Sequence, residues 1–356
     1  MKRLLTIVAL LLGVCGLLAY TSHTLTTSSG STGAKVLNLY NWGDYIDPQL
    51  LTKFQKETGY HVNVETFDSN EAMFTKLKQG GTHYDLTVPS DYMVSKLKQA
   101  HLLQPIDRSR LTGLTNYDPL FLNKSYDPGN TYSLPYFWGT LGIIYNDRFV
   151  KPGSLTHWSQ LWSPKYRDQI MLIDSARDIL GMALAEQGHS MNTTNPATLR
   201  AATHKLNALS PNVKAVVADE IKMYMIQDEA AVAVDWSGEA AEMLSHNRHL
   251  HYVVPSEGSN LWIDNLVIPK SAQHYAAIYA FLNFMSRPEN AAQNAEYIGY
   301  ATPNRRAKVL LPKAIRNDRQ FYPTRQTTRH LQIYRDLSPN VVQTYNDRYL
   351  EFKMHH

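Results

Sequence analysis

Apolar residues recur along this chain in short blocks whose spacing alternates between that of strands and that of helices. Residues 36–40 form an apolar block, and residues 61–67 alternate apolar and polar side chains, as a half-buried strand does. Between them, Asp47-Pro48 offers a helix N-cap with proline in the first turn, and Gly59 is a stop signal. The pattern predicts a strand, a helix and a second strand.

The alternation of strand and helix continues downstream. A helix is expected to open at Ser69 or Asn70, and strands are expected at 84–88, 170–173 and 230–234. Repeated units of this kind predict an α/β fold in which mostly parallel sheets are flanked by helices.

Two loops that lead into strands indicate crossings between two lobes. The aromatic loop at 136–139 precedes a strand at 141–146, and Gly258 precedes a strand at 261–268. The expected divisions are 1–33 for a signal or lipid-anchor region with a flexible tether, 34–140 plus 260–300 for lobe 1, 141–259 for lobe 2, and 301–356 for C-terminal helices packing across the lobes.

Composition fits a globular protein of about two domains. The chain has 356 residues, of which 44% are hydrophobic and 19% charged. Its net charge of +4 is mild and the basic residues are dispersed, so nucleic acid is not an expected partner. A cationic ligand would have to be attracted locally, by carboxylates.

The N-terminus carries an export signature. Lys2 and Arg3 precede an apolar run over residues 4–19, as in a secretory signal. Cys15 is the only cysteine of the chain, and Leu12-Gly13-Val14-Cys15 is similar to a bacterial lipobox, whose cysteine is lipidated. The alternatives are a buried cysteine in a signal or retained anchor, and cleavage near residue 20.

In each case the folded part lies outside the cytoplasm, at the extracellular face of the membrane or in the periplasm. Residues 21–33 are rich in Ser, Thr and Gly, which indicates a flexible tether. Without further cysteines, the folded part cannot depend on disulfides.

Pairs of aromatic and acidic residues follow several of the predicted strands. They are Trp42-Gly43-Asp44-Tyr45, Ser90-Asp91-Tyr92, Asp235-Trp236 with Glu239, and Trp262-Ile263-Asp264, with Tyr300 as a further candidate. Aromatic faces attract organic cations, and carboxylates bind ammonium groups through charge-assisted hydrogen bonds. Most of these pairs fall at the carboxyl ends of strands, where α/β sheets place their ligands.

Each acid also has a purely structural interpretation. Asp264 lies within an apolar strand, where an unpaired charge is costly, so a cationic partner is expected, either a ligand or a basic side chain. Ser175 and Asp178 have the spacing of a capping box, and Glu239 suits the first turn of a helix. A cluster of three histidines at 246–251 matches no zinc pattern.

Several longer motifs resemble those of one family, the spermidine/putrescine-binding proteins of bacterial ABC importers. They are Tyr40-Asn41-Trp42-Gly43-Asp44-Tyr45, Tyr84-Asp85-Leu86-Thr87-Val88-Pro89-Ser90-Asp91-Tyr92, Leu134-Pro135-Tyr136-Phe137-Trp138-Gly139, Leu261-Trp262-Ile263-Asp264 and Gly299-Tyr300-Ala301-Thr302-Pro303-Asn304. The resemblance implies a two-lobed, periplasmic-binding-protein-like (type II) fold with a ligand cleft between the lobes.

The resemblance also assigns residues to the ligand site. The matching positions are Trp42, Tyr45, Ser90, Tyr92, Trp236, Trp262, Asp264 and Tyr300. Asp44 and Glu239 match carboxylates of putrescine binders, and Asp178 matches an acidic residue of the family. Ser175 replaces an aspartate of spermidine binders, and the glutamine near their C-terminus aligns with Arg335. The choice between triamine and diamine stays open.

The aromatic–acidic pairs predict a receptor for an organic cation, and the resemblance implies a monomeric polyamine receptor that serves an ABC permease, with no catalytic residue, cofactor or metal. Another binding protein, for a betaine or choline-like cation, is less expected because quaternary ammonium sites use few carboxylates. An extracellular carbohydrate-active enzyme is the third hypothesis, since two acids across a sugar can hydrolyse it.

Overall fold

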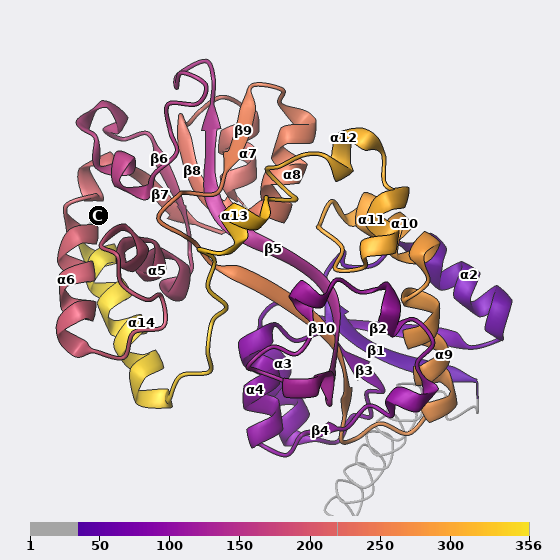
Figure 1. Ribbon diagram of the computed structural model, residues 1–356. Coiled ribbons are helices and arrows are strands. Elements are labelled where there is room, and N and C mark those ends of the chain that lie inside the picture. Colours follow the sequence, from indigo (N-terminus) through magenta and orange to yellow (C-terminus); the bar gives the residue numbers. More distant parts are fainter. Residues whose placement is uncertain (1–34, 219, 356) are drawn as a thin grey trace, which may run out of the picture.

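A computed structural model describes residues 35–218 and 220–355 of the chain. The described residues form two lobes that share one ten-stranded sheet with the order β2-β1-β3-β10-β5-β8-β6-β7, while β4 pairs with β10 and β9 with β5 (Figure 1). Cys15 and the export signature lie outside the described residues. Within residues 35–218 and 220–355, no helix has the length and apolarity needed to cross a membrane.

Lobe 1 is the unit whose buried core uses residues 37–138 and 261–322. Its strands are β1 (Val36–Trp42), β2 (His61–Phe67), β3 (Leu86–Thr87) and β4 (Leu103–Gln104). Its helices are α2 (Pro48–Thr58), α3 (Asn70–Gln79), α4 (Asp91–Gln99), α9 (Tyr275–Met285), α10 (Pro288–Ile298), α11 (Arg305–Leu310) and α12 (Lys313–Arg316).

Lobe 2 is the unit whose core uses residues 141–252 and 334–352. Its strands are β6 (Ile170–Ile173), β7 (Val213–Val217), β8 (Val232–Trp236) and β9 (Leu250–Val253). Its helices are α5 (Ala176–Glu186), α6 (Pro196–Asn207), α7 (Glu220–Ile226), α8 (Ser237–His246) and α14 (Pro339–Met354), and α13 (Arg325–Thr328) lies between the lobes (Figure 1).

Two long strands carry the chain between the lobes. β5 (Ser133–Asn146) leaves lobe 1 and enters lobe 2, and β10 (Leu261–Pro269) returns. Because β5 and β10 run in opposite directions, they pair antiparallel with each other. β10 also pairs antiparallel with β3, and β5 with β8. The sheet is therefore mixed, with parallel pairing confined to β1 with β2 and β3, and to β6 with β7 and β8.

Local sequence signals explain where the first helices begin and end. Asp47 caps α2 by accepting a hydrogen bond from the amide of Gln49 at 2.8 Å, and Gly59 ends it in the left-handed conformation with φ 76°. Ser69 caps α3 in the same way. These starts confirm the expectations from the sequence.

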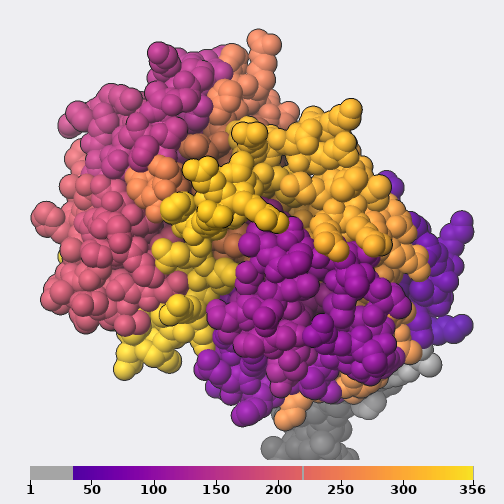
Figure 2. All heavy atoms as spheres, in the orientation of Figure 1, coloured from indigo at the N-terminus to yellow at the C-terminus, as the bar shows by residue number. Residues whose placement is uncertain are grey.

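The C-terminal segment divides between the two lobes. Residues up to Tyr322 complete the core of lobe 1, whereas Tyr334 and the buried face of α14 complete that of lobe 2. α14 packs on α5 and α6. In the space-filling view the same segment lies over the boundary between the lobes (Figure 2).

Candidate functional site

Asp264 on β10 is the centre of a polar cluster in lobe 1. Its carboxylate accepts hydrogen bonds from the hydroxyl of Tyr45 at 2.6 Å and from that of Ser90 at 2.7 Å. Ser90 is the N-cap residue of α4 but makes no capping bond, because its hydroxyl donates to Asp264 and accepts from the side-chain amide of Asn70 at 3.0 Å. Loops after β1 and β3 thus reach one carboxylate, as their strand-end positions predicted.

Burial determines the electrostatics of this carboxylate. Only 6% of Asp264 is exposed, and among the described residues no lysine, arginine or histidine forms an ion pair with it. Desolvation raises its pKa from 3.8 to about 6, and the two hydroxyl donors oppose this rise by stabilising the ionised form. The cationic partner expected for Asp264 is thus not a side chain of the described residues.

Aromatic rings surround the cluster. The ring of Tyr300 meets those of Tyr45 and Trp262 edge-on, each at a centroid distance of 5.4 Å. Two glycines make room for these rings: a Cβ on Gly139 would lie 2.2 Å from the Trp262 ring, and one on Gly238 would lie 1.3 Å from that of Tyr300. Any larger residue at these positions would displace an aromatic wall.

Three more predicted residues lie around lobe 1 without touching Asp264. The indole of Trp42 donates to the carbonyl of Val88 at 2.8 Å, and the hydroxyl of Tyr92 donates to Glu71 at 3.2 Å. Asp44 is exposed, with φ 48°, and the structure brings it into no hydrogen bond or ion pair with the other candidate residues. Among these three residues, Asp44 is the most exposed and has no side-chain hydrogen bond within the described part of the chain.

A second buried carboxylate, Asp178 in the first turn of α5, organises the candidate residues of lobe 2. It accepts hydrogen bonds from Ser175 at 2.7 Å, Trp236 at 3.2 Å and Tyr334 at 2.8 Å. Burial raises its pKa, while these donors and the nearby Arg177 act to lower it. The capping-box interpretation is wrong, because Ser175 donates to the Asp178 side chain and makes no side-chain cap bond.

Glu239 connects the two lobes. It lies in the first turn of α8 in lobe 2, and its Oε1 accepts the hydroxyl of Tyr300 from lobe 1 at 3.0 Å. Its Oε2 lies 3.0 Å from the ammonium of Lys222 on α7. The position suits the helix dipole as predicted, and the side chain also joins the aromatic wall of one lobe to the polar groups of the other.

The two remaining acids of the aromatic pairs hold the backbone. Asp91 accepts the amides of Tyr92 at 2.6 Å and Ile263 at 3.1 Å, which fixes α4 against β10. Asp235 accepts the amide of Trp236 at 2.7 Å. Burial raises the pKa of both carboxyls well above the usual value, and the neighbouring charge of Glu239 adds to the rise at Asp235.

Sequence reasoning missed Tyr334. The alignment pointed to Arg335, whose side chain is exposed, whereas Tyr334 is buried and binds Asp178. The guanidinium of Arg177 stacks over the Tyr334 ring at 4.4 Å and holds it in place. An aromatic residue in a polar stretch was the available signal, but only the fold shows that it reaches α5.

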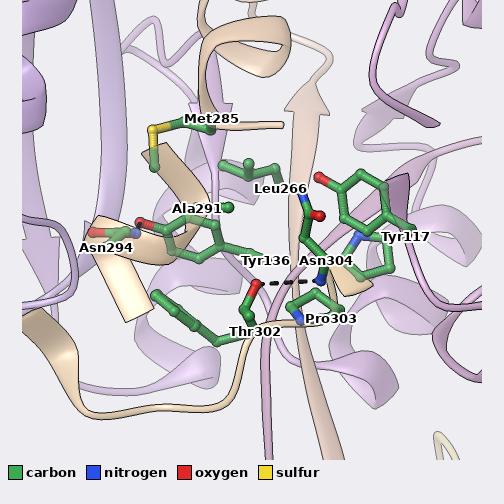
Figure 3. A pocket seen from close by; sticks show the side chains of 11 residues that line it. Tyr117, Tyr136, Leu266, Met285, Ala291, Asn294, Thr302, Pro303 and Asn304 are labelled. Atoms are coloured by element: carbon green, nitrogen blue, oxygen red, sulfur yellow. Dashed lines mark hydrogen bonds between the residues drawn. The ribbon is translucent and has the colours of Figure 1, made fainter. Parts of the chain in front are cut away.

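A small cavity behind the site lies inside lobe 1 (Figure 3). None of the predicted site residues lines it. One of its walls is Tyr136, whose hydroxyl donates to the carbonyl of Tyr45 at 2.8 Å and accepts from the amide of Asn294 at 2.8 Å. We interpret this region as the support that orients Tyr45 toward Asp264.

The histidine cluster has a structural explanation. His249 and His251 lie 2.8 and 2.9 Å from the two carboxylate oxygens of Asp147, which fastens β9 to the end of β5. Within the described ranges no group of three or more His, Cys, Asp and Glu side chains is arranged to hold a metal ion.

Two lobes joined by crossing strands, with polar and aromatic side chains gathered where they meet, define the solute-binding class of α/β protein. Residues 49–323 match the family of bacterial extracellular solute-binding proteins. The chain belongs to this family, and within it to the branch of spermidine/putrescine-binding proteins, as its similarity to individual members shows.

The chain is 41% identical to the spermidine/putrescine-binding periplasmic protein of Escherichia coli K12 over 303 aligned residues. The alignment covers 85% of this chain and 87% of the relative. The chain is 33% identical over 321 residues to the putrescine-binding periplasmic protein SpuD of Pseudomonas aeruginosa, covering 85% and 88%. The solved structure of the spermidine/putrescine ABC transporter substrate-binding protein PotD from Streptococcus pneumoniae shares 53% identity and superimposes with a TM-score of 0.86, covering 90% of this chain and 99% of that chain.

Proposed function

We propose that this protein captures spermidine or putrescine between its lobes and delivers it to the permease of an ABC importer, as a binding protein without enzymatic activity. The names of the relatives support the ligand class. Export to the cell surface or periplasm fits the family, and Cys15 is the proposed point of lipid attachment. The protein acts as a monomer.

One observation carries the proposal: each lobe contributes a buried carboxylate that lacks a cation of its own. Asp264 in lobe 1 and Asp178 in lobe 2 both receive hydroxyl donors, and within the described ranges neither forms an ion pair with a basic side chain. Each carboxylate retains free acceptor capacity for an ammonium group. Two separated anions suit the two ends of a linear diamine or triamine.

The aromatic residues would bind the carbon chain between the ammonium groups. We assign the walls to Trp42, Tyr45, Tyr92, Trp236, Trp262 and Tyr300, the hydroxyl donors to Ser90 and Ser175, and further carboxylates to Asp44 and to Glu239, which is paired with Lys222. Each buried methylene contributes about 0.8 kcal/mol, and the ring faces attract the flanking charges. We propose that 34–140 with 260–300 and 141–259 are the lobes that close on the ligand.

The test is calorimetry with putrescine, spermidine and spermine on the unmodified protein and on Asp264→Asn. The substitution leaves the ligand ammonium without its buried counter-charge, and we expect affinity to fall by about 2–5 kcal/mol. Asp347→Asn removes an exposed acid on α14 whose hydrogen bond is to Gln343 and not to a candidate residue, and it serves as the charge-matched control.

Unchanged binding by Asp264→Asn would remove this carboxylate from the site. Choline, glycine betaine and oligosaccharides belong in the same titration series. Heat from one of them and none from polyamines would overturn the proposed ligand class.

A further inference from the structure

Lys222 on α7 has an ammonium group that bridges two carboxylates of α8. It lies 3.0 Å from Oε2 of Glu239 and 2.9 Å from Oε2 of Glu242. The Lys222 side chain is 26% exposed and that of Glu239 22%, whereas Glu242 is 51% exposed. Oε2 of Glu239 is buried, and within residues 35–218 and 220–355 the Lys222 ammonium group is the polar partner it has.

Glu239 occupies an intermediate place among the candidate residues. Its other oxygen accepts the hydroxyl of Tyr300, whose ring packs against Tyr45, and Tyr45 in turn donates to Asp264. Three residues before Glu239 in the chain, Trp236 donates to Asp178. Glu239 is thus linked by one chain of contacts to the lobe 1 carboxylate and, through Trp236 at the N-cap of its helix, to that of lobe 2.

Asp264, Asp178 and Glu239 differ in whether a basic side chain already balances their charge. Asp264 and Asp178 have no basic ion-pair partner among the described residues, but Glu239 is already neutralised by Lys222. A diamine has two ammonium groups, which the two free carboxylates satisfy. A triamine has a third, internal ammonium group, and its natural partner would be the carboxylate that Lys222 occupies.

Building on the polyamine function proposed above, we infer that Lys222 is a specificity-determining residue: its ammonium group competes with an internal ligand ammonium for Glu239 and biases the site toward putrescine over spermidine. A ligand with an internal cation must first displace Lys222 from Glu239, or be held near an unscreened positive charge. Glu242 offers the displaced ammonium group a second, solvent-exposed partner, so displacement leaves it paired.

The experiment measures the ratio of spermidine to putrescine affinity by calorimetry. In Lys222→Gln the internal carboxylate is free, and we expect the ratio to rise by about fivefold, the upper end for a partly exposed ion pair. In Glu242→Gln the ammonium group has only Glu239 left, so the ratio is expected to fall. Glu242→Gln changes an exposed side chain, so it tests the inference even if Lys222→Gln fails to fold.

Lys205→Gln is the matched control. It removes another lysine–glutamate pair of lobe 2, with the same 3.0 Å separation from Glu186 and a side chain 31% exposed, and should leave the ratio unchanged. A ratio that stays within twofold in both Lys222→Gln and Glu242→Gln, while the unmodified protein binds a polyamine, overturns the inference alone. Failure of the unmodified protein to bind any polyamine overturns the proposed function and this inference together.

Discussion

At the scale of single residues, the site is built from carboxylates whose charge the protein itself leaves uncompensated. Asp264 was predictable as such, because an acid within an apolar strand requires a partner. Its two hydroxyl donors come from loops more than 170 positions away in the chain, and no local pattern reveals such a pairing. Tyr334 escaped prediction for the same reason, because Asp178 lies 156 positions away, and Lys222 did so because its partners lie on a different helix.

Binding should depend on pH through Asp264. Its folded-state pKa of about 6 lies above the ordinary 3.8, so the folded protein binds the proton more tightly than the unfolded chain does. The ligand-free protein therefore loses stability as pH rises from 3.8 to 6, when this carboxyl ionises without a cation. A polyamine binds the ionised form, so affinity should fall up to about tenfold per unit below pH 6.

Calorimetry at about pH 5 and about pH 7.5 measures this effect. Burial also raises the pKa of Asp178, which acts in the same direction. Asp264→Asn should show a shallower pH dependence because one titrating group is missing. An affinity that is equal at both pH values would show that neither carboxyl has to ionise for binding.

At the scale of elements, helix starts were predictable wherever a local cap defines them, as Asp47 and Ser69 do for α2 and α3. The direction of the central strands was not predictable, because antiparallel pairing of β5 and β10 follows from the path of the chain between lobes. Ser175 shows a further limit: its spacing to Asp178 fits a cap, but tertiary packing turns both side chains toward Trp236 and Tyr334.

Helix α14 should be essential for the stability of lobe 2. Tyr345 is fully buried, and its hydroxyl donates to the carbonyls of Met191 and Thr193. Tyr345→Ala is expected to destabilise the protein by about 3–5 kcal/mol through the cavity it leaves and the lost bonds. Leu350→Ala on the same helix, where 55% of the side chain is exposed, should change the free energy of unfolding by less than about 0.5 kcal/mol.

Urea denaturation followed by circular dichroism measures both variants. Equal midpoints for Tyr345→Ala and Leu350→Ala would mean that α14 contributes little to the core of lobe 2.

At the scale of the whole molecule, alternating strand and helix patterns together with the motif resemblance were enough to predict two lobes, because each lobe needs its own apolar core. A ligand held by carboxylates of both lobes should stabilise the two together. At about one hundred times the dissociation constant, putrescine should add about 2.7 kcal/mol and raise the unfolding temperature by about 5 °C.

Thermal unfolding of Asp178→Asn and Asp264→Asn checks that both lobes take part. At the same putrescine concentration, each variant should lose most of the ligand-induced increase in unfolding temperature. If the unfolding temperature of either variant still increased by the full amount, one lobe alone would hold the ligand.

The C-terminal segment has a consequence for biogenesis. Tyr334 and the buried face of α14 are the last parts of the core of lobe 2, and Tyr334 also donates to Asp178. A chain exported from its N-terminus therefore cannot finish this lobe until its final turn of helix has crossed the membrane. Until Tyr334 and α14 have crossed, Asp178 lacks one of its three donors, so polyamine capture is expected to follow the export of this helix.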